Sequence, residues 1–240
     1  MDDQTKKTLR TRNDIGPMFD SIAWRYDFLN HLLSFGIDRY WRRKAIGKIS
    51  EILKNPRIID VATGTGDLAI EAMKINPVKI TGIDISEKML ELGRQKIKTR
   101  NLEDVIEFVK CDSENICFED NTFDAAIVAF GVRNFKDPVK GLAEMRRVVR
   151  IGGLVMVLEF SKPDGFIFKH LYNFYFRNFL PFAGALFSRH MDAYKYLNES
   201  VMDFADKEKF IQMMRESGLS EIKQTRMTRG IASIYTGVKK

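Results

Sequence analysis

The sequence has few of the residues that bind metals or form covalent cross-links. Its 240 residues include two cysteines and three histidines. Cys111 and Cys117 do not form a C-x-x-C pair, and the histidines do not form an H-E-x-x-H motif, so no standard zinc site can be drawn. We therefore expect no metal centre, and we expect both thiols to be reduced and structural.

Long apolar runs are also missing. No stretch of 18 or more uncharged apolar residues occurs, because Lys169, Arg177 and Pro181 interrupt even the aromatic segment FIFKHLYNFYFRNFLPFAGALF. The first residues, MDDQTKKTLRTRND, lack the apolar core of a signal peptide and carry acids that transit peptides lack. We expect a cytoplasmic location and no membrane span, and we leave peripheral contact with the inner face of the membrane open.

What the composition does provide is ordinary for one globular domain. The hydrophobic set makes up 45% and charged residues 30% of the chain. The formal net charge of +7 would suit nucleic acid or an anionic membrane surface, but many proteins with neither partner share such a charge. We treat the chain as a single domain over residues 1–240.

Five short apolar runs predict a parallel sheet with crossover helices. They are RIIDV (57–61), VKITGID (78–84), VIEFVKCD (105–112), FDAAIVAF (123–130) and GLVMVLEF (153–160). Ser86 can cap a helix over 87–98, and Asp137 and Pro138 suit the start of a helix over 139–149.

The C-terminal part predicts a different strand direction. A helix capped by Asp206 and ended at Gly218 precedes EIKQTRM and IASIYTGV, which the short turn TRG should join in an antiparallel hairpin. A nicotinamide-binding domain usually continues with parallel strands. A parallel sheet closed by an antiparallel last strand is typical of S-adenosylmethionine methyltransferases.

The stretch IIDVATGTGDL, residues 58–68, satisfies the loose nucleotide fingerprint through Gly64 and Gly66. Acids around it decide between cofactors. Asp60 would repel a pyrophosphate but could accept hydrogen bonds from the ammonium of a methionine moiety. Asp84 could bind both ribose hydroxyls of either cofactor, and Asp112 could read an adenine amino group. Each acid could simply cap a helix, but the three together favour S-adenosylmethionine.

Three further stretches resemble the ubiquinone/menaquinone biosynthesis C-methyltransferases, a family that methylates a ring carbon of a polyprenyl quinol. They are YDFLNHLLSFGIDRYW (26–41), AFGVRNFKDPVKGLAEMRRVVRIGGLVMVLEFSKP (129–163) and DAYKYLNESV (192–201). The sequence departs from the usual family pattern at Leu29, Asp38, Ala129 and Arg150-Ile151. Ala129 stands where a cofactor-contacting serine is frequent, and alanine offers no side-chain hydrogen bond.

The resemblance implies an α/β fold of the Rossmann-like class I methyltransferase type, with a helical N-terminal cap and an aromatic helical lid. The expected segments are a cap over 1–52, a cofactor-binding core over 53–162, a lid over 163–205, and a C-terminal helix and hairpin over 206–240. The cofactor residues expected from the residue pattern and the resemblance together are Asp60, Gly64, Thr65, Gly66, Asp84, Ile85, Asp112 and Ser113.

The implied reaction is the conversion of demethylmenaquinol to menaquinol, and an enzyme that also serves ubiquinone remains the alternative. We expect Arg133, Asn134 and Tyr194 to be catalytic, because Arg133 could stabilise a phenolate and Asn134 could position it or a water molecule. Tyr194 is a weaker candidate than the other two, as is His190. An arginine paired with a structural acid is the competing interpretation of Arg133. The expected partner is a polyprenyl quinol, and a homodimer is left open.

Two other functions are weaker alternatives. A nucleic-acid methyltransferase would suit the basic charge, but AFGVRN is not the N-P-P or D-P-P turn associated with methylation of exocyclic base amines, and we expect no nucleic-acid partner. A non-catalytic nucleoside-binding protein would bind the cofactor without turning it over.

Overall fold

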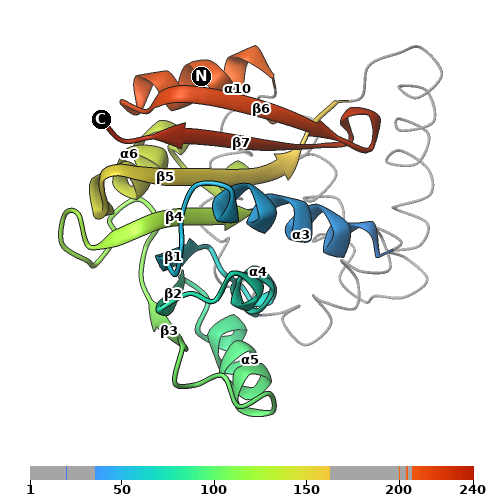
Figure 1. The fold of residues 1–240 in the computed structure, drawn as a ribbon, viewed down its shortest axis with the longest axis vertical. Helices are drawn as coiled ribbons and strands as arrows, with labels where there is room; N and C mark the ends of the chain where they lie inside the picture. The colour runs from blue at the N-terminus through green and yellow to red at the C-terminus, as the bar shows by residue number, and fades with distance from the viewer. Residues whose placement is uncertain (1–19, 21–35, 163–199, 201–203, 205–206) are drawn as a thin grey trace, which may run out of the picture.

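The computed structural model describes residues 20, 36–162, 200, 204 and 207–240. Among them, seven strands form one sheet in the order β3-β2-β1-β4-β5-β7-β6 (Figure 1). The strands are β1 (Arg57–Val61), β2 (Lys79–Asp84), β3 (Ile106–Lys110), β4 (Phe123–Ala129), β5 (Val149–Phe160), β6 (Ser220–Met227) and β7 (Ala232–Val238). The first five are parallel, and β7 pairs antiparallel with both β5 and β6. This confirms the expected sheet and its antiparallel closure.

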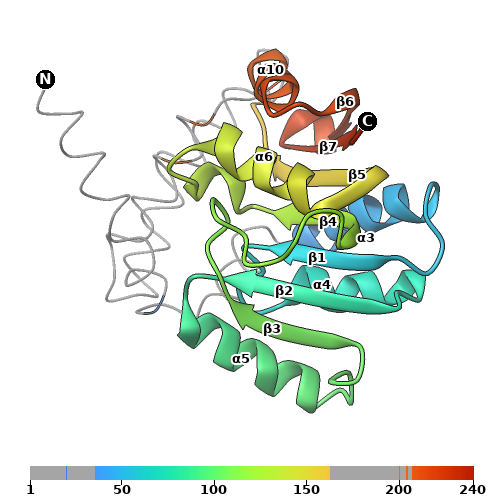
Figure 2. The same ribbon diagram turned by 90° about the vertical axis from the view of Figure 1, so that its left-hand side faces the viewer.

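Helices cover both faces of this sheet (Figure 2). They are α3 (Ile37–Ser50), α4 (Asp67–Ala72), α5 (Glu87–Lys98), α6 (Pro138–Val148) and α10 (Glu208–Glu216), with short 3-10 turns η1 (Met73–Ile75), η2 (Val132–Asn134) and η4 (Thr228–Gly230). Apolar residues of α3, α4 and α5 pack in one core cluster, and those of α6 and α10 pack in a second.

The alternation of strand side chains explains why both faces are apolar. Ile58 belongs to the cluster under α3, and its neighbour Ile59 belongs to the cluster under α6. Both are fully buried. A run such as RIIDV therefore has no polar face to present to water, which is why the sequence predicts a strand buried on both sides.

Capping residues set two of the helix starts as expected. The Ser86 hydroxyl accepts a hydrogen bond from the Met89 N–H at 3.3 Å, and the Asp137 carboxylate accepts one from the Lys140 N–H at 3.1 Å. The start of α10 differs from the prediction. Its N-cap residue is Lys207, at φ 57°, without a side-chain cap, whereas Asp206 lies outside the described residues. Gly218 ends the helix region at φ 85°, as the sequence predicts.

One aromatic ring packs close to three glycines from three elements. A Cβ atom at Gly66, Gly82 or Gly93 would lie 2.4, 2.5 or 2.8 Å from the nearest atom of the Phe108 ring. These separations are shorter than any real contact between carbon atoms. The glycine loop, β2 and α5 can therefore approach the ring only because none of the three positions carries a side chain.

The strand register brings the expected cofactor acids to one edge. Asp60 of β1 pairs with Gly82 of β2, and Asp84, two residues further on, pairs with Lys110 of β3. Asp112 follows β3 by two residues. Since parallel strands end at the same edge, the three carboxylates lie at the carboxyl ends of adjacent strands.

Candidate active site

The glycine loop after β1 is held by Asp84. The backbone N–H of Gly64 donates to Asp84 Oδ2 at 2.9 Å, and the N–H of Ser86 donates to Oδ1 at 2.9 Å. Burial raises the pKa of Asp84, and the N–H groups of Ser86 and Gly64 partly offset that rise. Asp84 thus ties the glycine loop to the start of α5. Gly64 and Gly66 have φ values of 57° and 83°, the left-handed region in which glycine is favoured.

Asp60 is the most buried of the three expected cofactor acids, with 1% of its surface exposed. Its Oδ2 accepts a hydrogen bond from the Thr63 hydroxyl at 2.7 Å, whereas Oδ1 has no hydrogen-bond partner among the described residues. Burial raises the pKa of Asp60 to about 7, although the Thr63 hydroxyl, the backbone N–H of Ala69 and the Arg42 charge lower it. A buried acceptor without a donor fits a cationic ligand, and the methionine ammonium of S-adenosylmethionine is such a donor.

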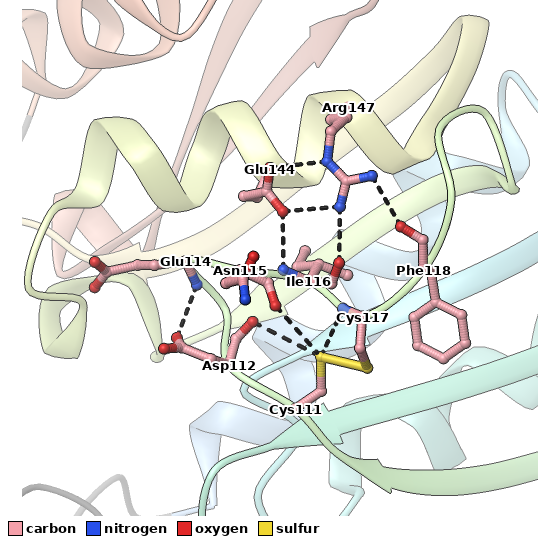
Figure 3. Close-up of a disulfide and its surroundings, with 9 residues drawn as sticks. All are labelled: Cys111, Asp112, Glu114, Asn115, Ile116, Cys117, Phe118, Glu144 and Arg147. Atoms are coloured by element: carbon pink, nitrogen blue, oxygen red, sulfur yellow. Dashed lines mark hydrogen bonds and ion pairs between the residues drawn. A yellow bond between two sulfur atoms is a disulfide. The ribbon is translucent and has the colours of Figure 1, made fainter.

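The loop that follows β3 carries Asp112 (Figure 3). Asp112 Oδ1 accepts a hydrogen bond from the Glu114 N–H at 2.9 Å. Two side chains of α6 hold the end of this loop at Ile116. The Ile116 N–H donates to Glu144 Oε2 at 2.8 Å, and Arg147 Nη2 donates to the Ile116 carbonyl at 2.7 Å. The Asp112 side chain is exposed at the sheet edge, where an adenine amino group could reach it.

The same loop contains both cysteines, and the structure joins Cys111 to Cys117 in a disulfide (Figure 3). The expectation of two reduced thiols is therefore wrong for this structure. The loop turns sharply, with Asp112 bridged to Asn115, and brings the two Cα atoms to 6.1 Å, within the range that a disulfide spans. Asp112 and Ser113 belong to the chain segment that the disulfide closes into a ring.

Backbone strain marks the turns after β1 and β4. Ala62 and Phe130 have φ values of 53° and 57°, which residues other than glycine adopt at a cost of about 1 to 3 kcal/mol each. The two turns also touch, since a Cβ atom at Gly131 would lie 2.8 Å from Ala62 Cβ. Glycine at position 131 thus lets the β4 turn pack against the β1 turn.

Arg133 lies in η2, directly after the β4 turn, and is 7% exposed. Its Nη1 donates to Glu159 Oε1 at 2.9 Å and also to the Phe130 carbonyl. Its Nε has no hydrogen-bond partner among the described residues. The competing interpretation of Arg133, pairing with an acid, therefore holds for Nη1, while Nε is a buried donor without an acceptor among the described residues.

Glu159 is a site residue that sequence reasoning missed. It is fully buried at the end of β5, and burial raises its pKa while the Arg133 charge lowers it. One signal was available. Glu159 is the single acid in the apolar run GLVMVLEF, and acids are almost never fully buried unless they are paired.

Thr65 takes part in a polar network that links the glycine loop to two helices. Lys96 Nζ of α5 donates to Thr65 Oγ1 at 2.8 Å and to Asp67 Oδ1 at 2.7 Å. Arg42 of α3 lies 3.8 Å from Asp67 Oδ2 and also pairs with Asp38. The hydroxyl of Thr65 is thus held by protein groups, and the network fixes the loop between α3 and α5.

Three other predicted residues are described by the structure. Ile85 is 41% exposed beside Asp84, Ser113 is half-buried in the disulfide ring, and the Asn134 N–H donates to the Gly131 carbonyl at 2.9 Å. Tyr194 and His190 lie outside the described residues, as does almost all of the expected lid.

Asp20 is the one described residue of the first 35 in the chain. Its carboxylate accepts a hydrogen bond from the Ser86 hydroxyl at 2.5 Å, and its charge contributes to the raised pKa of Asp84. This places part of the expected N-terminal cap against the start of α5, next to the acid that we expect to bind ribose.

The described residues contain neither a cluster of metal-binding side chains nor a membrane-spanning helix. No group of three or more histidine, cysteine or acidic side chains within the described ranges could hold a metal ion. In that same part of the chain, no helix is long and apolar enough to cross a membrane.

The sheet order, the glycine loop and the acids at three strand ends define the class: a Rossmann-like S-adenosylmethionine-dependent methyltransferase. Solved structures share the fold. A methyltransferase from Thermotoga maritima, described as a possible histamine N-methyltransferase, has a TM-score of 0.68 at 20% identity and covers 94% of this chain and 99% of its own. A putative methyltransferase from Methanococcus maripaludis has a TM-score of 0.63 at 22% identity, covering 92% and 93%.

The chain belongs to the ubiE/COQ5 methyltransferase family, whose model matches residues 5–239. The ubiquinone/menaquinone biosynthesis C-methyltransferase UbiE of Geotalea daltonii is 49% identical over 94% of this chain and 96% of its own length. The demethylmenaquinone methyltransferase of Bacteroides fragilis is 44% identical over 92% and 91%. The resemblance seen in the sequence is confirmed.

Proposed function

We propose that the protein transfers a methyl group from S-adenosylmethionine to a ring carbon of demethylmenaquinol and so forms menaquinol. Family membership over nearly the whole chain supports this reaction class. The structural observation that carries the proposal is the buried Arg133, whose Nε lacks a partner among the described residues and which follows the strained β4 turn at the carboxyl edge of the sheet.

The cofactor fits the acids at this edge. Asp60 Oδ1 would accept from the methionine ammonium, Asp84 would accept from the ribose hydroxyls, and Asp112 with Ser113 would bind the adenine. The bound cofactor supplies an electrophilic methyl group on its sulfonium. Asp84 already accepts two backbone N–H groups, so its remaining lone pairs would serve the ribose.

The substrate needs help to become a nucleophile. A phenol titrates near pH 10, and forming its anion at pH 7 costs about 4 kcal/mol. Arg133 would stabilise the oxyanion by donating from Nε, and Asn134 would position the ring oxygen or a water molecule. The hydroxyl proton would pass to water, and the ring carbon would then attack the methyl group, with the carbon–carbon bond forming as the methyl–sulfur bond breaks and the sulfur keeping the bonding electrons. The ring carbon would then lose its own proton to water, and the ring would become aromatic again.

The decisive experiment is a transfer assay with S-adenosylmethionine labelled on its methyl group. We expect label in the product when a short-chain demethylmenaquinol is kept reduced by dithionite, and none when the same compound is left as the quinone, which is not nucleophilic at the ring carbon. A parallel reaction with a demethylated ubiquinol precursor separates the menaquinone-specific enzyme from one that serves both quinones. Cofactor binding without label transfer to any quinol would reject the proposal.

A further inference from the structure

Glu159 makes its contacts where β5 ends beside the β4 turn. Oε1 accepts from Arg133 Nη1 at 2.9 Å and from the Phe160 N–H at 2.8 Å, and Oε2 lies 3.4 Å from the Arg133 backbone N–H. Leu158, the residue before Glu159, pairs with Ala129 at the end of β4. Glu159 therefore lies level with the first residue of the β4 turn. A single carboxylate thus contacts both the backbone and the guanidinium of Arg133.

Stability alone does not account for this ion pair. The Arg133 and Glu159 side chains are 5% and 0% exposed, and removing two charges from water costs several kcal/mol for each ion. Apolar residues of similar volume usually serve a core as well or better. The alternative is that the pair fixes a geometry that the protein uses.

The ion pair fixes the direction in which the Arg133 Nε–H bond points. Nη1 is shared between Glu159 and the Phe130 carbonyl, and the guanidinium carbon lies 5.4 Å from the centre of the Phe160 ring. Because a guanidinium is planar and rigid, these contacts also set the direction of the Nε–H bond. A buried donor left without an acceptor costs about 1 to 3 kcal/mol, so an unpartnered Nε is costly unless a ligand accepts from it.

We propose that Glu159 is a positioning residue for methyl transfer, which holds Arg133 so that Nε donates to the ring oxygen of the quinol. This inference rests on the proposed role of Arg133. Glu159 itself touches neither substrate nor cofactor. Because its charge balances that of Arg133, the pair presents a directed hydrogen-bond donor to the substrate and not an unscreened cation.

Two substitutions separate position from charge. Glu159→Asp keeps the charge but draws the carboxylate back by one methylene, and Glu159→Gln keeps the length but removes the charge. We expect both to lower kcat by about 10 to 100-fold, because each loosens Nη1. The dissociation constant for S-adenosylmethionine, measured by calorimetry, should stay within about twofold of the parent value, as should KM for the quinol.

The pH profile adds a readout that a purely structural role would not change. In Glu159→Asp the quinol must ionise with less help, so turnover should rise more steeply toward the pKa of a free phenol than in the parent. If Glu159 only compensated a buried charge, Glu159→Asp would keep the parental kcat and the parental profile. That result would overturn the proposal.

A double-mutant cycle tests whether Glu159 acts through Arg133. In an Arg133→Gln background, adding Glu159→Gln should change kcat by less than about threefold, since there is no guanidinium left to position. The double variant also carries no unpaired buried charge, so it keeps the comparison possible if a single variant unfolds. Losses that simply multiply would show that Glu159 acts independently and would reject the inference.

Asp124→Asn is the matched control. Asp124 lies at the amino ends of the parallel strands, on the side of the sheet away from the candidate site. It accepts from Arg150 Nε at 2.5 Å and from the Arg57 N–H at 2.7 Å. It should leave kcat unchanged. If Arg133→Gln retains parental turnover, the proposed role of Arg133 fails. If Arg133→Gln is slow while both Glu159 variants are parental, the positioning inference alone fails.

Discussion

Asp84 Oδ2 accepts a hydrogen bond from the Gly64 N–H at 2.9 Å, so the acid expected to bind ribose also holds the loop expected to surround the cofactor. Asp84→Ala should therefore weaken S-adenosylmethionine binding by about 2 to 4 kcal/mol, because the ribose loses its acceptor and the loop loses its tether. Calorimetry on the folded variant measures this. Unchanged affinity would remove Asp84 from the cofactor site.

Asp60 should make cofactor binding depend on pH. Its pKa is about 7, and only the carboxylate attracts an ammonium, so the affinity should rise roughly eightfold from about pH 6 to about pH 7.5. Asp60→Asn should bind more weakly and show a flat profile over the same range. A parental affinity that does not change with pH would contradict an ammonium at Asp60.

The same carboxylate should lower the stability of the cofactor-free protein. Unfolded, Asp60 ionises near pH 3.8, and folded near 7, so the folded state loses stability as pH rises between these values, up to about 4 kcal/mol. Relative to the parent, Asp60→Asn should therefore gain about 1 to 4 kcal/mol on going from about pH 4 to about pH 8. Urea unfolding at both pH values provides the measurement, and an equal stability difference at the two would argue against a raised pKa.

Arg133→Ala should bind the cofactor normally but lose about two to three orders of magnitude in turnover, the usual effect of deleting one oxyanion-stabilising donor. Its activity should recover as pH rises toward the pKa of the phenol. Steady-state kinetics over this pH range, with calorimetry as the binding control, checks both parts. A variant with parental turnover would show that Arg133 is structural.

The disulfide should contribute measurably to stability. It closes a loop with a sequence separation of 6, and reducing a ring of this size should lower the free energy of unfolding by about 2 kcal/mol in the chain-entropy model. Urea denaturation with and without dithiothreitol tests this in the parent. Cys117→Ser serves as the control because it should not respond to the reductant, and a parent equally insensitive would mean that the bond is not formed in solution.

The fold was largely predictable because its signals are local. Runs such as RIIDV and the capping residues Ser86 and Asp137 act within a few neighbouring residues. The exceptions depend on distant partners. β5 begins at Val149, before the apolar run, since Val149 pairs with Phe123 across an irregular register.

Some parts of the candidate site could likewise be predicted from local sequence, and others could not. The acids after β1, β2 and β3 could be placed because parallel strands end on the same side of a sheet. The pairing of Glu159 with Arg133 could not be predicted, since the two residues are 26 positions apart and the contact depends on the turn after β4. The cysteine pairing was missed for a related reason. The spacing of Cys111 and Cys117 does not reveal how sharply the chain turns between them.

The packing of Phe108 against Gly66, Gly82 and Gly93 has a consequence for how this region can evolve. An added methyl group at any of the three glycines meets the ring, and a smaller residue at position 108 leaves a cavity that costs about 3 to 5 kcal/mol. Either change alone is harmful, while a matched pair can restore the packing. The four positions are therefore epistatically coupled, and substitutions accepted in this part of the cofactor-binding fold should arise in compensating pairs across loop, strand and helix.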